Sequence, residues 1–168
     1  AALLLTAFGS AWYHLAPDNA RLIWDRLPIA LACAGLLAGG WGETHAASGR
    51  SGALLSALLA VFAVFSVFWW YATELRGQGD LRCYLLLQIA PFVLAPMWQW
   101  LRGRPAAERR AFGIALLLYA AAKAAELYDH EIGRLLGGLT GHTLKHLLAT
   151  AAAGVIVADL VRRSHQPA

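Results

Sequence analysis

Two histidines, His142 and His146, lie four residues apart at the start of an apolar run near the end of the chain. Residues at this spacing share one face of a helix, so both imidazoles can bind the same metal ion. Ionisable side chains are costly inside a membrane-spanning segment, and those found there usually serve a function. The pair therefore predicts a metal site in the membrane, where the available substrate is a lipid.

Three further polar residues are expected at the same depth. Ser10 and His14 are also four residues apart, near the end of the first apolar run, and Asp25 lies in the first turns of the second run. Consecutive runs joined by short connections form antiparallel helices. The end of the first run and the starts of the second and sixth runs then fall on one side of the membrane.

This set of residues predicts hydrolytic zinc chemistry. Three histidines with one open position are typical of a catalytic zinc site, where the bound water has a pKa of about 7. Asp25 is the natural proton acceptor beside that water, and Ser10 can donate a hydrogen bond to a histidine, to the water or to a developing oxyanion. The expected reaction is hydrolysis of an amide or ester in a lipid.

The composition predicts an all-α, polytopic membrane protein. Of the 168 residues, 59% are hydrophobic and 14% are charged, whereas soluble domains have about 45–50% and about 25%. The net charge of +4 does not indicate nucleic-acid binding, because the arginines cluster in short connections between apolar runs. Cys33 and Cys83 lie in apolar runs and are interpreted as buried free thiols.

Apolar runs near the length of a membrane span position these residues. Six runs are predicted in a single domain over 1–168, at about 1–15, 20–41, 51–73, 81–101, 107–128 and 139–161. The first run is short, and the chain does not begin with methionine. We therefore expect that a preceding helix is missing from this sequence.

The distribution of arginines predicts the orientation. The connections near 42–50 and 102–110 and the C-terminal end carry the excess of arginine, so this side is expected to be cytoplasmic. The abundance of alanine, leucine and arginine is typical of a GC-rich bacterial genome, which favours a bacterial inner membrane. The zinc site is then expected toward the outer face.

The order and spacing of the five polar residues resemble the alkaline ceramidase family. Its pattern is S-x3-H, a downstream Asp and a late H-x3-H, here Ser10, His14, Asp25, His142 and His146. The wider superfamily includes adiponectin-type receptors and GPI-anchor lipid remodelling proteins. The resemblance implies a seven-helix bundle, of which six spans are present and the first helix is missing. It also implies zinc bound by the three histidines, and hydrolysis of the ceramide amide to a sphingoid base and a fatty acid, with Asp25 and Ser10 positioning water and handling protons.

Two other functions remain open. One is a receptor or transport-like bundle of the same superfamily, in which zinc is structural. The other is a haem-binding bundle, although histidines one turn apart suit a small ion better than the two axial positions of a porphyrin.

Other charged residues are given structural interpretations. Asp18 is predicted to cap the second helix. Lys123 and Glu126, three residues apart, are predicted to form a buried ion pair. Asp129 is expected to cap a helix or line the outer mouth of the site. Lys145 is expected to extend toward the outer membrane interface.

Overall fold

The computed structural model describes residues 2–45, 49–137 and 140–165, which form helices and connecting turns without a strand. The helices are α1 (Ala2–Leu15), α2 (Asn19–His45), α3 (Gly49–Glu74), α4 (Arg82–Leu101), α5 (Ala106–Leu127), α6 (Asp129–Leu136) and α7 (Gly141–Ser164). The prediction of an all-α fold is confirmed, and each of the six predicted runs corresponds to a long helix or, for α1, a shorter one. The additional helix is α6, in the connection between the fifth and sixth predicted runs.

Four of these helices, α2, α3, α4 and α7, are long and apolar enough to cross a membrane. Helix α5 is long and apolar enough to cross a membrane only when it is counted together with α6. The chain bends by 85° between these two helices. Helix α1 has 14 residues, which gives a length of about 21 Å against the roughly 30 Å of a bilayer core. The chain is therefore a polytopic helical protein with four to five candidate spans, and α1 is a predicted span that is shorter than the bilayer core.

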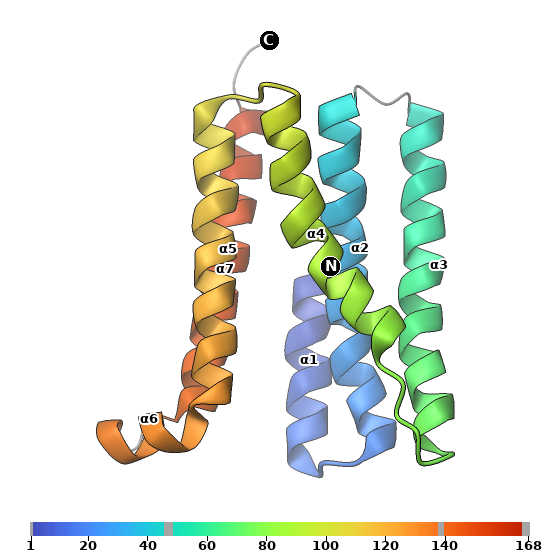
Figure 1. Cartoon of the computed structure of the whole chain (residues 1–168), viewed down its shortest axis with the longest axis vertical. Coiled ribbons are helices and arrows are strands. Elements are labelled where there is room, and N and C mark those ends of the chain that lie inside the picture. Colours follow the sequence, from blue (N-terminus) through green and yellow to red (C-terminus); the bar gives the residue numbers. More distant parts are fainter. Residues whose placement is uncertain (1, 46–48, 138–139, 166–168) are drawn as a thin grey trace. The chain divides into compact units, whose positions relative to one another are not determined.

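The chain divides into two compact units, residues 1–103 and 104–168, and the structure defines each unit by itself. The first unit contains α1 to α4, and the second contains α5 to α7 (Figure 1). The single domain predicted over 1–168 stays a prediction.

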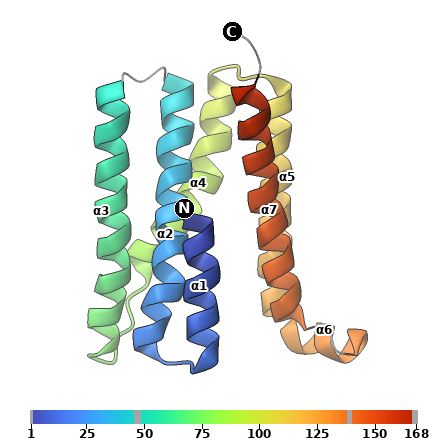
Figure 2. The ribbon, with the colours of Figure 1, turned by 180° about the vertical axis from the view of Figure 1, so that it is seen from behind.

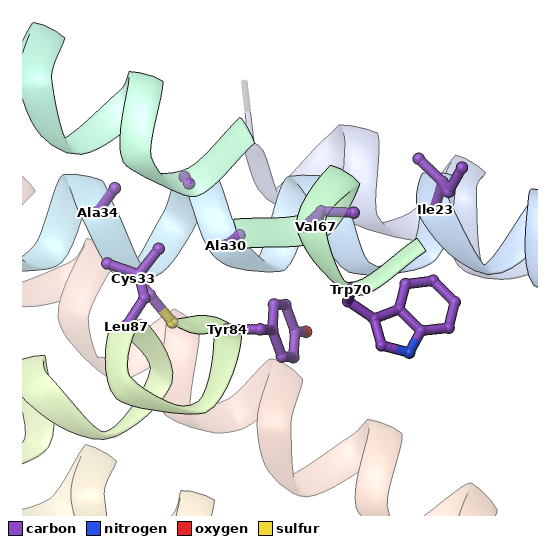
Figure 3. Packing of buried hydrophobic residues seen from close by; sticks show 9 residues of the cluster. Ile23, Ala30, Cys33, Ala34, Val67, Trp70, Tyr84 and Leu87 are labelled. Carbon is purple, nitrogen blue, oxygen red and sulfur yellow. The ribbon is translucent and has the colours of Figure 1, made fainter. Parts of the chain in front are cut away.

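Helix α2 is the centre of the first unit, because it contacts α1, α3 and α4. Its small residues Ala30 and Ala34 are almost fully buried, as is Val67 of α3 (Figure 3). On the α4 side, Leu87 and Tyr84 complete the same cluster. Small residues at helix contacts let the backbones approach closely, which is how helices pack where the solvent is lipid.

The ends of α2 and α3 next to the α1–α2 turn are joined by polar contacts. Asp18 accepts a 2.7 Å hydrogen bond from the backbone N–H of Arg21, which confirms its predicted role as the cap of α2. The side-chain amide of Asn19 donates to Glu74 at the end of α3, at 3.2 Å. The Asn19–Glu74 bond joins the start of α2, which carries Asp25, to the end of α3.

The second unit is built on α5 and α7, which pack side by side along their length (Figure 2). Near the start of α5, the buried Glu108 forms ion pairs with Arg104 at 2.9 Å and with Arg163 of α7 at 3.6 Å. At the other end of the pair, α6 turns sharply away from α5 before the chain enters α7. The two predicted histidine ligands of this unit lie at that end.

Candidate metal centre

The start of α7 is positioned by hydrogen bonds from two caps. The hydroxyl oxygen of Thr140 accepts from the backbone N–H of Thr143 at 3.1 Å. The carboxylate of Asp129 accepts from the backbone N–H of His142 at 2.6 Å. The first N–H groups of a helix lack intrahelical partners, and a carboxylate there also interacts favourably with the helix dipole. The predicted capping role of Asp129 is confirmed, and it joins the start of α6 to His142.

A glycine brings α7 against α5 at the same level. A Cβ atom added to Gly141 would stand 2.6 Å from the Cα of Asp129 and would also overlap the carbonyl oxygen of Ala125. Only a residue without a side chain fits this contact. The close approach therefore depends on the residue immediately before His142.

The rings of His142 and His146 meet edge to face across one turn of α7. Their Nε2 atoms are 3.0 Å apart, the ring centroids are 4.7 Å apart, and the ring planes make an angle of 73°. Two nitrogens bound tetrahedrally to zinc at 2.0–2.1 Å would lie about 3.3 Å apart. His142 is half-buried and His146 is exposed. The pair thus fits two ligand positions of one small ion with a shift of a few tenths of an ångström.

The ammonium group of Lys145 bonds Glu126 of α5 at 2.9 Å, and the expectation that Lys145 extends toward the outer membrane interface stays a prediction. Glu126 also bonds Lys123 at 2.9 Å, so the predicted Lys123–Glu126 pair is confirmed, although both side chains are more exposed than predicted. Helices α5 and α7 run side by side, so Glu126 and Lys145 come together although they are 19 positions apart in the sequence. The Lys145–Glu126 pair connects the first turns of α7 to α5, and the Asp129 cap connects them to the start of α6.

The first unit contains the other three predicted residues, Ser10 and His14 on α1 and Asp25 on α2. A glycine again determines the approach of the two helices. A Cβ atom on Gly9 would stand 2.7 Å from the carbonyl carbon of Trp24 and 3.3 Å from the backbone nitrogen of Asp25. Helix α1 therefore touches the backbone of α2 at the level of Ser10 and Asp25.

The carboxylate of Asp25 is half-buried and receives no hydrogen bond from the residues that the structure describes. Its neighbour Arg26 lies on another face of α2, with the guanidinium 3.9 Å from the ring of Trp70 and 5.6 Å from that of Tyr84. These cation–π contacts hold the guanidinium of Arg26 in the α2–α3–α4 core.

An apolar groove of about 310 Å³ runs between α1 and α2 beside these residues. It is lined by Leu5, Phe8, Gly9, Trp12, Trp24, Leu27, Pro28 and Leu31. Two of these residues, Gly9 and Trp24, directly precede Ser10 and Asp25. Neither Ser10 nor Asp25 lines this groove itself, and its apolar lining is of the kind that suits a hydrocarbon group.

The predicted residues thus form two groups, each within one unit. Ser10, His14 and Asp25 share the α1–α2 end of the first unit, and His142 and His146 share the first turns of α7. That His14 joins the histidine pair stays a prediction. Sequence reasoning missed Gly9 and Gly141, although a glycine immediately before a polar residue in an apolar helix is a signal of a close helix contact.

Comparisons of this chain with protein-family models, with curated proteins and with solved structures find no match. The ceramidase resemblance therefore rests on the five residues and their spacing.

Proposed function

We propose that this protein is an intramembrane, zinc-dependent hydrolase that cleaves the amide bond of ceramide or a related lipid. His14, His142 and His146 are the proposed zinc ligands. The observation that carries the proposal is the 3.0 Å separation of the Nε2 atoms of His142 and His146, on a helix whose start is held by Asp129 and Glu126. A rigid, prearranged pair of imidazoles suits a metal centre.

When bound, zinc would polarise the lipid carbonyl and activate a water molecule. Asp25 would take the proton of the attacking water, because its carboxylate has no described hydrogen-bond donor and the guanidinium of Arg26 points into the core. Ser10 would donate a hydrogen bond to the developing oxyanion or orient His14, which lies one turn away on α1. Asp25 would then return the proton to the leaving amine, giving a free amine and a fatty acid.

The apolar groove supports a lipid as the substrate. It lies in the first unit, between the two helices that carry Ser10 and Asp25, and its lining residues are apolar. A hydrocarbon chain that enters from the bilayer would lie in this groove with its carbonyl toward α1 and α2 residues at the level of Gly9. We propose a multi-pass protein of a bacterial inner membrane, with a cytoplasmic C-terminus and the zinc site toward the outer face.

Zinc content is the first test. The purified protein is expected to contain about one equivalent of zinc, and His142→Ala and His14→Ala are each expected to reduce it below about half an equivalent. His165→Ala is the matched control, because His165 ends α7 at the opposite end of the helix. Equal zinc content in all four proteins would refute the metal centre.

Release of fatty acid from ceramide in mixed micelles tests the reaction itself. Asp25→Asn keeps the size of the side chain, removes the proton acceptor, and is expected to lower turnover by about 10²-fold or more. Zinc at full occupancy in a wild-type protein that releases no fatty acid from any lipid amide would favour the receptor or transport alternative. A Soret absorption band in the purified protein would instead support haem.

A further inference from the structure

Helix α6 is short, amphipathic and uncovered. Among its described residues, none is buried in the protein. Ile132, Leu135 and Leu136 have the i, i+3, i+4 spacing of one helix face, and 83% of the surface of Leu135 is exposed. Arg134 lies on the opposite side of the helix and Glu131 at the border of the apolar face, and the two form an ion pair at 3.7 Å with both side chains in contact with solvent.

The direction of α6 indicates where its apolar face lies relative to a bilayer. Its axis makes an angle of 85° with α5. Spans are tilted by about 20° from the bilayer normal on average. If α5 crosses the bilayer, a helix nearly perpendicular to it runs along the membrane surface. Gly137, with a φ of 59°, then ends α6, so the chain leaves this direction after two turns.

We propose that α6 is an interfacial helix whose Ile132–Leu135–Leu136 face lies in the boundary between lipid headgroups and acyl chains. The partner is the lipid of the bilayer itself, because apolar side chains at that depth gain from leaving water while the Glu131–Arg134 pair stays hydrated. This placement of α6 depends on neither zinc binding nor lipid hydrolysis.

The consequence concerns the depth of the histidine pair. Asp129 is the first residue of α6, and its carboxylate bonds the backbone N–H of His142 at 2.6 Å. The depth of α6 therefore fixes the depth of the first turn of α7. An interfacial α6 places His142 just below the headgroups, where the amide of a membrane lipid is found.

Site-directed spin labelling tests the proposal. In a background with Cys33→Ala and Cys83→Ala, single cysteines at 131, 132, 134, 135 and 136 are labelled, and the protein is reconstituted into phosphatidylcholine vesicles. Collisions with oxygen, which concentrates in lipid, are compared with those of a water-soluble nickel chelate. A label at Leu117, an exposed residue of α5, is the lipid reference, and one at Gln78, in the α3–α4 connection, is the water reference.

The expected result is an alternating profile, with oxygen favoured at 132, 135 and 136 and the nickel chelate favoured at 131 and 134. Nickel collisions dominating at all five positions would overturn the proposal, because α6 would then lie in water. Few collisions with either reagent at the three apolar positions would mean that protein covers this face. Oxygen dominating at all five would mean that α6 enters the bilayer core.

A second measurement avoids the label and guards against misfolding. In vesicles with brominated acyl chains, the added fluorescence of Leu135→Trp is expected to be quenched, and that of Arg134→Trp is expected to be retained. Helical circular dichroism equal to that of the wild type is required of both variants. Equal quenching of the two added tryptophans in folded proteins contradicts the interfacial orientation.

Discussion

The backbone N–H of His142 donates a 2.6 Å hydrogen bond to the carboxylate of Asp129, across a gap of 13 residues. This bond connects the bend between α5 and α6 to the helix that carries His142 and His146. Together with the Lys145–Glu126 pair, it determines where α7 begins relative to α5. The geometry of the histidine pair therefore depends on residues that are not themselves ligands.

Replacing Asp129 by alanine is expected to lower the free energy of unfolding by about 1 kcal/mol, the usual effect of removing a helix cap. The free N–H of His142 would let the first turn of α7 fray, so zinc affinity is expected to fall as well. Thermal unfolding in detergent and zinc titration measure the two effects. Asp129→Asn retains an acceptor oxygen and should lose less, and Glu131→Ala, on the exposed face of α6, should change neither.

Gly141→Ala is expected to separate α7 from α5. The new Cβ would overlap the carbonyl oxygen of Ala125, and backbone atoms cannot move aside as a flexible side chain can. Gly154→Ala in the same helix has no atom near the added Cβ, so it should stabilise the protein by about 0.5–1 kcal/mol through helix propensity. Opposite changes in melting temperature are therefore expected, and changes of the same sign would contradict the close α5–α7 contact.

Gly9→Ala is expected to displace α1 from α2, because a Cβ there would overlap the carbonyl group of Trp24. Ser10 would then move relative to Asp25, so lipid hydrolysis is expected to fall more than stability does. Gly35→Ala is the control within α2, since its added Cβ meets no atom. A fatty-acid release assay alongside thermal unfolding separates the two effects, and an unchanged rate for Gly9→Ala would show that this contact does not position the site.

The α3–α4 connection predicts a pH dependence of stability. Hydrogen bonds from the side chain of Arg82, and then from the indole of Trp69, hold the pKa of Asp80 well below its usual range. A carboxylate with a lowered folded-state pKa contributes stability above its unfolded pKa of about 3.9, and this contribution is lost as the pH falls further. The melting temperature of the wild type is therefore expected to be higher than that of Asp80→Asn at pH 7, and this difference is expected to shrink below about pH 4. A constant difference over the acid range would exclude this origin.

The sequence predicted the helices because membrane spans follow from hydropathy and length alone. Each long apolar run became a helix, and the spacing of His142 and His146 was enough to place their rings together on one face. Asp18 was recognised as a cap from its position next to a helix start. For Asp129 a cap was one of two predicted roles, and the structure shows that it caps α7 from 13 residues away. Helix α6 was missed because eight residues are too few for a hydropathy signal, although its alternation of apolar and charged residues is visible in the sequence.

Only the tertiary structure decided which distant residues meet. Lys145 pairs with Glu126, and Gly9 and Gly141 bring whole backbones into contact, because helices from different parts of the chain pack together. Hydropathy contains no information on these partners, since it reports the preference of each residue for lipid and not its neighbours. Hydropathy and residue spacing were sufficient to predict the class of fold and the proximity of His142 and His146. The tertiary structure decided what holds that pair in place, through contacts whose energy depends on three-dimensional proximity.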